Sequence, residues 1–395
     1  IIPKELGITL EKSLKVSNDL RALYESDPEV HRLVDLAKSV EGMPRNVGTH
    51  AAGVIIAPAD LKDYVPLQLG AEGSVITQYD KDKLEGLGLL KMDFLGLKNL
   101  TNISKTIELI KLDNPEFSLP KDENDKEVFK MLASGDVVGV FQLESAGMSK
   151  VIKELNTSSL DAIISALALY RPGPMDIIPT FIKRKFGKES VTYPHEDLHL
   201  ILKDTYGTIV YQEQIMQIAV KFAGYSLGRA DILRRAVSKK KKEVLEQERI
   251  SFVKSSINKG YDRSVAEEIY DYIVKFADYG FNKAHSVAYA KLSYQTAYLK
   301  CHYPTYYMST LMTTFIGSNN DIVSYYKEAL RKNIGVLGPN INESLNYFAS
   351  VNNNILFPLT IIKGLGEVKV KEIVEERLKG KFTSFKDFLI RTKDI

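Results

Sequence analysis

The sequence predicts an α+β protein: a small mixed sheet comes first, then a large, mostly helical region and the start of a helix-hairpin-helix. Strand-like apolar runs gather between residues 49 and 98. From Leu100 to about Leu337, apolar residues recur at helical spacing. A Gly-Leu-Gly turn follows at residues 364–366, and such a turn is typical of the connection between two paired helices.

The composition is that of an ordinary globular protein of two to three domains. The chain has 395 residues, of which 44% are hydrophobic and 26% charged. Cys301 is the only cysteine, which excludes an internal disulfide and favours a reducing, cytoplasmic compartment. No apolar run reaches the roughly 18 residues that span a membrane, so we expect no membrane contact. Because the chain starts at Ile1 and ends at Ile395 without a cap, we expect it to be a fragment.

The first 45 residues have the pattern of charged helices. Asp27 and Pro28 form a helix start, with the aspartate as cap and the proline at the first helical position. The apolar face of this helix carries Val30, Leu33, Val34 and Ala37.

Three strands are expected, at residues 52–57, 75–79 and 88–96. Lys91 and Asp93 share one face of the third strand, because side chains alternate along a strand. A carboxylate in so apolar a run is costly unless it is paired or binds a metal. The pattern leaves both possibilities open: an ion pair with Lys91 at the rim of the sheet, or Asp93 as a metal ligand.

A basic helix is expected within residues 228–242, which hold seven Lys or Arg and one Asp. Arg235 and Lys239 stand four residues apart, where like charges repel on a helix. Such a cluster is tolerated on a solvated face, and it becomes favourable when a polyanion covers it. We therefore predict a phosphate-binding surface.

Residues 278–290 combine a tight turn at Gly280 and Asn282 with the start of a long helix. His285 and Tyr289 lie on one face of that helix. Lys283 lies in the first turn, where the helix dipole disfavours a cation unless an anion is near. The stretch suits either a helix start with a core histidine or a nucleotide site.

The Gly-Leu-Gly turn is typical of a helix-hairpin-helix, in which backbone amides approach a DNA phosphate. Gly364 and Gly366 would form the turn, with Lys363 and Lys369 adding positive charge. The alternative is a helix C-cap followed by a second helix.

Four shorter stretches place polar residues in apolar surroundings, and their pattern favours turn and cap chemistry. They contain His50, Gln142, Arg171 and Gln212. The sequence holds no phosphate loop of the Gly-x-x-x-x-Gly-Lys type, no zinc-ligand spacing and no nucleophile elbow.

In this order, the motifs resemble the alpha subunit of bacterial DNA polymerase III, the C-family of replicative polymerases. The resemblance is carried by residues 48–58, 90–97, 141–148, 171–175, 211–216, 230–241, 279–290, 293–296, 302–304 and 338–344. It implies the end of a thumb at 1–48, the second half of a palm at 49–98, fingers at 99–340 and the start of the helix-hairpin-helix region at 341–395.

The family implies template-directed nucleotidyl transfer in which three aspartates hold two magnesium ions (Mg2+). Asp93 matches the third aspartate, and Lys91 on the same face is the second implied catalytic residue, which would lie beside the metals or phosphates. The other two, in an Asp-x-Asp motif, would precede Ile1, so we expect this piece alone to be inactive. The residues implied to bind the incoming nucleotide are Arg234, Arg235, Lys239, Lys240, Tyr279 and His285. Those implied to hold duplex DNA are Lys363, Gly364, Gly366 and Lys369.

The implied partners are primer-template DNA, deoxynucleoside triphosphates, and the sliding clamp and clamp loader of the replisome. The implied location is the cytoplasm, in association with the nucleoid. A competing hypothesis is a non-catalytic DNA-binding module that uses the basic helix and the hairpin. Such a module has no need of Asp93, whereas a polymerase does. A kinase-like triphosphate enzyme is a third and weaker alternative.

Overall fold

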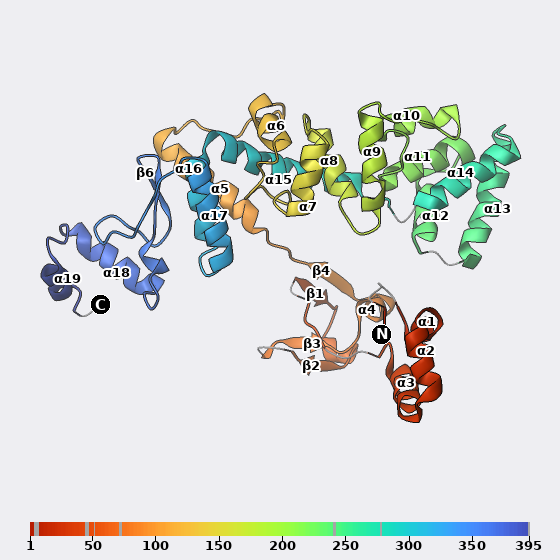
Figure 1. Cartoon of the computed structure of the whole chain (residues 1–395), viewed down its shortest axis with the longest axis horizontal. Helices are drawn as coiled ribbons and strands as arrows, with labels where there is room; N and C mark the ends of the chain where they lie inside the picture. Colours follow the sequence, from red (N-terminus) through yellow and green to blue (C-terminus); the bar gives the residue numbers. More distant parts are fainter. Residues whose placement is uncertain are drawn as a thin grey trace. The chain divides into compact units, whose positions relative to one another are not determined.

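The computed structural model describes residues 1–3, 8–43, 47–50, 52–70, 73–239, 242–276 and 279–393. The chain divides into two compact units, unit 1 (residues 1–96) and unit 2 (residues 97–395) (Figure 1). Most elements are helices and the sheets are small, which confirms the predicted α+β class.

Unit 1 opens with three short helices. They are α1 (Leu10–Val16), α2 (Asn18–Ser26) and α3 (Pro28–Val40). As predicted, Asp27 caps α3, accepting a hydrogen bond of 2.8 Å from the Glu29 amide, and Pro28 takes the first helical position. Val34 is buried but Leu33 is exposed, so α3 buries a narrower stripe than its pattern predicts.

The described strands of unit 1 form two separate antiparallel ladders rather than one mixed sheet. They are β1 (Gly53–Ile56), β2 (Leu67–Leu69), β3 (Val75–Thr77) and β4 (Leu90–Asp93). β1 pairs with β4, and β2 pairs with β3. β2 was not predicted, because its three residues lie between Pro66 and Gly70 and are too few to show a period-two pattern. Helix α4 (Lys81–Gly86) packs beside β4 and contributes Leu84 to the small core.

Unit 2 consists mainly of helices. In chain order they are α5 (Lys98–Asp113), α6 (Lys126–Ala133), α7 (Ala146–Glu154), α8 (Leu160–Leu169), α9 (Ile178–Lys185), α10 (His199–Leu202), α11 (Gln212–Ala223), α12 (Leu227–Lys239), α13 (Lys242–Asn258), α14 (Arg263–Phe276), α15 (Lys283–His302), α16 (Pro304–Thr314) and α17 (Asn319–Arg331).

Helix α15 lies at the centre of the packing in unit 2. It is 20 residues long and contacts α5, α6, α8 and α16 (Figure 1). The facing helix α8 is apolar on all sides, and each residue from Ala162 to Leu169 is buried. A second core fills the space among α10 to α14, and a third joins α5, α16 and α17 to strand β7 (Asn354–Leu356).

A buried ionic cluster holds the C-terminal part of α15. The Nζ atom of Lys300 lies 2.6 Å from Asp136 Oδ1 and 2.7 Å from Glu328 Oε1. Lys332 Nζ lies 2.9 Å from Asp136 Oδ2, and Arg331 pairs with both carboxylates. The Lys300 side chain is fully buried, so its charge depends on these partners.

The C-terminal part of unit 2 combines a small mixed sheet with two helices. The strands β5 (Val336–Leu337), β6 (Ala349–Val351) and β7 (Asn354–Leu356) lie in the order β5-β7-β6. A 3-10 turn, η6 (Leu359–Ile361), precedes α18 (Glu367–Leu378) and α19 (Phe385–Arg391). Among the residues that the structure describes, no helix is both long and apolar enough to cross a membrane.

Candidate functional site

The first candidate cluster lies on the β1–β4 ladder. Lys91 Nζ is 3.1 Å from Asp93 Oδ1, so the two side chains form the ion pair that the strand pattern allows. Gly53 lies opposite Asp93 across the ladder. A Cβ atom added to Gly53 would lie 2.6 Å from Lys91 Cε, 2.9 Å from His50 Nδ1 and 3.1 Å from Asp93 Oδ1. His50 therefore joins the pair, and only glycine leaves room for the three side chains.

Asp93 can supply one ligand to a cation. Its side chain is 45% exposed, and carboxylate oxygen is the donor that Mg2+ prefers. Within the described ranges, no group of three or more His, Cys, Asp or Glu side chains could hold a metal ion. The cluster thus fits one part of a magnesium site, with further oxygen ligands needed to complete it.

The second candidate cluster starts at the basic helix α12. Arg234 donates to Asp231 (2.8 Å) and to the side-chain oxygen of Gln212 (3.3 Å). Arg235 pairs with Asp231 at 2.8 Å, and its side chain is 68% exposed. The Arg234 guanidinium holds the pKa of Asp231 below its usual range. The carboxylate therefore stays charged and orients both arginines.

Other basic residues of this stretch have different surroundings. Arg229 makes a two-pronged pair with Glu248 of α13, so it serves packing between helices. Lys239 is the last residue of α12, and its side chain is not among those described. Lys240 lies outside the described residues. Of the four basic residues implied to bind the nucleotide phosphates, the structure thus describes the side chains of Arg234 and Arg235.

Gln212 connects the basic helix to the turn at residues 279–282. Its backbone amide donates to Phe281 O at 2.8 Å, and the Phe281 amide donates to Val210 O at 2.9 Å. The Gln212 side chain also donates to Gly280 O at 3.3 Å while accepting from Arg234. Residues 70 positions apart are thereby fixed beside one another.

Arg171 supports the same turn from another side. Its guanidinium donates to Tyr279 O and to Ala168 O, each at 2.9 Å. It also lies over the Phe281 ring, 4.3 Å from the ring centre. The ring of Tyr279 packs towards Phe276 rather than into the cavity described below.

A carboxylate from α11 lies beside the start of α15, where the lysine in the first turn calls for a nearby anion. Asn282 caps the helix by accepting from the His285 amide at 2.8 Å. Both carboxylate oxygens of Glu213 lie 3.0 Å from the Lys283 amide. Glu213 thus satisfies the N-terminal dipole and offsets the charge of Lys283, whose ammonium lies over the Tyr211 ring.

His285 lines a small cavity at this helix start. The imidazole is exposed rather than buried in a core, and it stacks on Tyr289 with ring centres 4.2 Å apart. The cavity has a volume of about 270 Å³. It is lined by Gln142, Met148, Leu167, Tyr170, Arg171, Phe281, His285, Ser286 and Tyr289.

The predicted hairpin residues lie on the surface. Lys363, Gly364, Gly366 and Lys369 are exposed, and Gly364 has φ +90°, which glycine adopts without strain. Helix α18 starts after Gly366 with no side-chain cap, so its first amides face outward. The element before the turn is only the short 3-10 turn η6, so the hairpin has one full helix rather than two.

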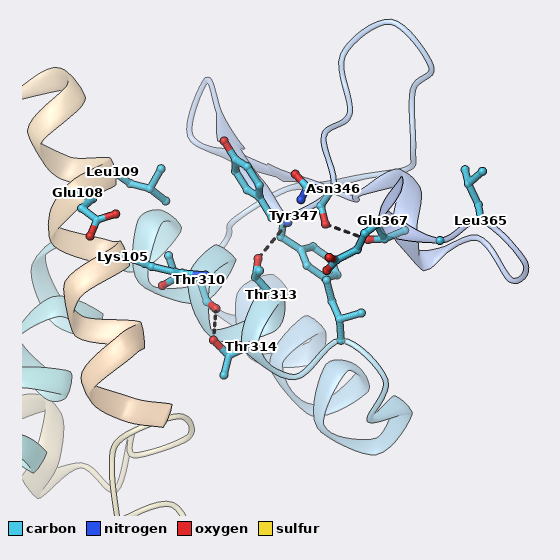
Figure 2. A pocket seen from close by; sticks show the side chains of 14 residues that line it. Lys105, Glu108, Leu109, Thr310, Thr313, Thr314, Asn346, Tyr347, Leu365 and Glu367 are labelled. Atoms are coloured by element: carbon cyan, nitrogen blue, oxygen red, sulfur yellow. Dashed lines mark hydrogen bonds between the residues drawn. The ribbon is translucent and has the colours of Figure 1, made fainter. Parts of the chain in front are cut away.

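A larger cavity of about 650 Å³ lies beside this hairpin (Figure 2). Leu365, Gly366 and Glu367 form one wall, and Lys105 of α5 lies on another. The threonines of α16 along its floor already hydrogen-bond to protein atoms: Thr313 accepts from the Phe348 amide at 3.0 Å.

The polar residues that pattern alone assigned to turns prove to support the candidate site. Arg171 and Gln212 hold the 279–282 turn, and His50 lies beside Asp93. The sequence signal for these residues was a polar side chain in an apolar stretch, and a role in a turn or helix cap explains that signal as well as a role in a site does. Their convergence depends on contacts between residues about 70 to 110 positions apart, which no local pattern encodes.

Comparison with protein families assigns consecutive parts of the chain to one kind of protein. Residues 1–96 match the bacterial DNA polymerase III alpha NTPase domain, and residues 99–260 match the bacterial DNA polymerase III alpha subunit finger domain. Residues 333–395 match a helix-hairpin-helix motif. The first two matches are to domains of the same subunit, and helix α12 lies within the second of them.

Curated relatives extend the match over nearly the whole chain. The DNA polymerase III subunit alpha of Bacillus subtilis is 48% identical over 99% of this chain and 35% of the relative. The subunit of Borreliella burgdorferi is 45% identical over 100% of this chain and 34% of the relative. The subunit of Staphylococcus aureus is 43% identical over 99% of this chain and 37% of the relative. The chain belongs to the bacterial DNA polymerase III alpha subunit family, and it spans about a third of the length of these relatives.

Proposed function

We propose that this chain is part of a DNA-directed DNA polymerase of bacterial chromosome replication. The observation that carries the proposal is the hydrogen-bonded connection from Arg234 through Gln212 to the turn before His285. It places a cationic surface and an exposed aromatic stack on one framework. A nucleotide presents the matching chemistry, a triphosphate joined to a flat base.

In this proposal the triphosphate of the incoming deoxynucleotide binds Arg234 and Arg235, with Lys239 and Lys240 adding charge. Asp231 holds both arginines in place, so their donors are oriented before the ligand arrives. His285, stacked on Tyr289, lies where the base and sugar would bind, and Tyr279 shapes the turn from behind. Binding in this manner neutralises the charge that develops on the leaving pyrophosphate.

Asp93 is proposed to be one carboxylate ligand of a pair of Mg2+ ions, with Lys91 holding it in position. When bound, these ions would activate the primer 3′-hydroxyl and stabilise the leaving group. The half-exposed carboxylate of Asp93 supports this role, and its pairing with Lys91 limits its motion. The remaining ligands are proposed to come from an Asp-x-Asp motif outside these 395 residues.

The exposed hairpin is proposed to hold the primer-template duplex. The outward amides at the start of α18 and the side chains of Lys363 and Lys369 suit phosphate oxygens and read no sequence. Sliding clamp and clamp loader are proposed partners of the whole protein, and the nucleoid its location. The proposed division is thumb end 1–48, palm 49–98, fingers 99–340 and hairpin region 341–395. The match of the finger family from residue 99 supports it.

The test compares two exposed arginines, each paired four residues away on its helix. Arg235 pairs with Asp231, and Arg263 pairs with Glu267. In a full-length subunit that contains this sequence, Arg235→Ala should raise the nucleotide KM about tenfold or more, because a charged contact to phosphate is lost. Arg263→Ala is the matched control and should leave it unchanged.

Primer-template affinity, measured on the same variants, separates the polymerase from the DNA-binding module. Duplex affinity should change little in Arg235→Ala. Equal losses in nucleotide and duplex affinity would make α12 a duplex contact and would favour the module.

A further inference from the structure

Gln142 adopts a backbone conformation that its residue type rarely takes. Its φ is 58°, in the left-handed region where a side chain crowds the backbone. Six described residues other than glycine have positive φ, and four of them are asparagines, which tolerate it. The other exception is Tyr206, whose ring packs edge-on against the buried Phe181. For Gln142 no such packing compensates the strain.

The strain is maintained by the residues on either side. The Phe141 amide donates to Thr296 Oγ1 at 3.1 Å, and Ser293 Oγ donates to Phe141 O at 2.8 Å. Both partners are fully buried on α15. Phe141 and Leu143 are themselves buried, so the turn sends both apolar neighbours inward and leaves Gln142 at the surface.

The Gln142 side chain lies in the wall of the His285 cavity with its amide group unused. Within the described part of the chain, it makes no hydrogen bond. Ser286 lines the same cavity, is fully buried, and its Oγ has no hydrogen-bond partner. A buried hydroxyl without a partner is costly, so the cavity is incomplete without a ligand or a water molecule.

The chemistry of the cavity indicates a neutral, polar ligand surface. Gln142 offers an amide that can donate and accept, and Ser286 offers a hydroxyl that can do the same. Arg171 directs two of its donors to the backbone carbonyls of Ala168 and Tyr279. The Gln142 amide and the Ser286 hydroxyl are both uncharged, which suits a sugar or base better than a phosphate.

We propose that Gln142 is a substrate-binding residue of the nucleotide pocket, held ready by its strained turn. Its amide and the Ser286 hydroxyl hydrogen-bond the uncharged sugar and base portion of the incoming nucleotide. This inference rests on the proposed function, in which the phosphates bind at Arg234 and Arg235. The contacts of Phe141 fix the backbone of this turn before binding, so the ligand does not have to order it.

The experiment separates strain from ligand binding in a full-length subunit that contains this sequence. Gln142→Gly removes both the strain and the amide, so it should raise the Tm and also raise the nucleotide KM about five- to tenfold. Gln142→Ala removes the amide only and should raise KM similarly without the gain in Tm. The matched control is Asn156→Gly, at an exposed residue with φ 44° outside the cavity lining, which should leave KM unchanged.

The outcome against the inference is a Gln142→Gly variant with a higher Tm and an unchanged KM, because the strain would then belong to folding alone. Ser286→Ala should raise KM too, and an unchanged value would contradict the proposed hydrogen bond from this hydroxyl to the nucleotide. Arg235→Ala separates a failure of the Gln142 contact from a failure of the whole nucleotide pocket. If it raises KM while the Gln142 variants do not, only this inference fails, and if none of them does, the nucleotide pocket itself is wrong.

Discussion

Lys300 shows how a single buried charge can organise its surroundings. Burial lowers the pKa of its ammonium group, and the carboxylates of Asp136 and Glu328 oppose that effect. Burial alone would raise the pKa of Asp136, but hydrogen bonds from Lys300, Lys332 and Arg331 bring it well below its usual range. The Asp136 carboxylate is therefore charged at neutral pH, and the burial of Lys300 depends on its ionic partners.

Removing one carboxylate from this cluster should destabilise unit 2. Asp136→Asn leaves Lys300 buried with Glu328 alone, which should cost about 3 kcal/mol. Hydrogen exchange of α15 amides measures the loss locally. The control is Asp271→Asn, which breaks a surface pair with Arg249 and should cost less than about 1 kcal/mol. Equal effects of the two variants would show that burial adds nothing.

The same cluster predicts an acid-sensitive stability. The pKa of Asp136 is lower in the folded chain than in the unfolded one, so its contribution is complete above the unfolded value of about 4. As pH falls from there towards the folded pKa, the unfolded state binds more protons and stability declines. Urea unfolding at pH 7 and pH 3 should show this decline, and Asp136→Asn should reduce it. A pH dependence that is the same in the variant contradicts the assignment.

At the scale of elements, the sequence predicted the helix starts, strands and turns that depend only on residues close together in the chain. The Asp27-Pro28 start of α3, the β1 and β4 strands and the turn before α15 follow from caps, alternation and glycine. The strand β2 was missed because Pro66 and Gly70 limit its pattern to three residues, whereas β3 lies within the longer alternating run 75–79. The two-ladder pairing was missed because it depends on tertiary contacts. For the site, the sequence indicated the residues with strong chemistry but not the ones that hold them, such as Arg171 and Gln212.

The β1–β4 ladder makes a prediction at Gly53. Alanine there would place its Cβ 2.6 Å from Lys91 Cε and 2.9 Å from His50 Nδ1, so both side chains must shift. In a full-length subunit, Gly53→Ala should slow primer extension about 10- to 100-fold, since small displacements of reacting groups cost that much. The control is Gly48→Ala, where an added Cβ meets nothing within 4 Å. Normal extension by Gly53→Ala would separate this cluster from catalysis.

At the scale of the whole molecule, Asp93 decides between a polymerase and a DNA-binding module. In a full-length subunit that contains this sequence, Asp93→Asn should reduce primer extension at least about 100-fold, because the proposed Mg2+ ligand would lose its charge. DNA affinity, measured by fluorescence anisotropy, should stay nearly the same. Asp82→Asn, at an exposed position of α4, is the control. Full activity of Asp93→Asn would overturn the polymerase proposal.

Helix α15 also has a mechanical consequence. Its first turn carries His285, and its last turns carry Lys300 and the buried cluster. A helix of 20 residues is about 30 Å long and behaves as a stiff rod. The cavity at its start and the ionic pairs of Lys300 with Asp136 and Glu328 near its end therefore belong to one continuous element. The ionic cluster thus fixes one end of the helix whose other end carries the proposed nucleotide-binding residue His285.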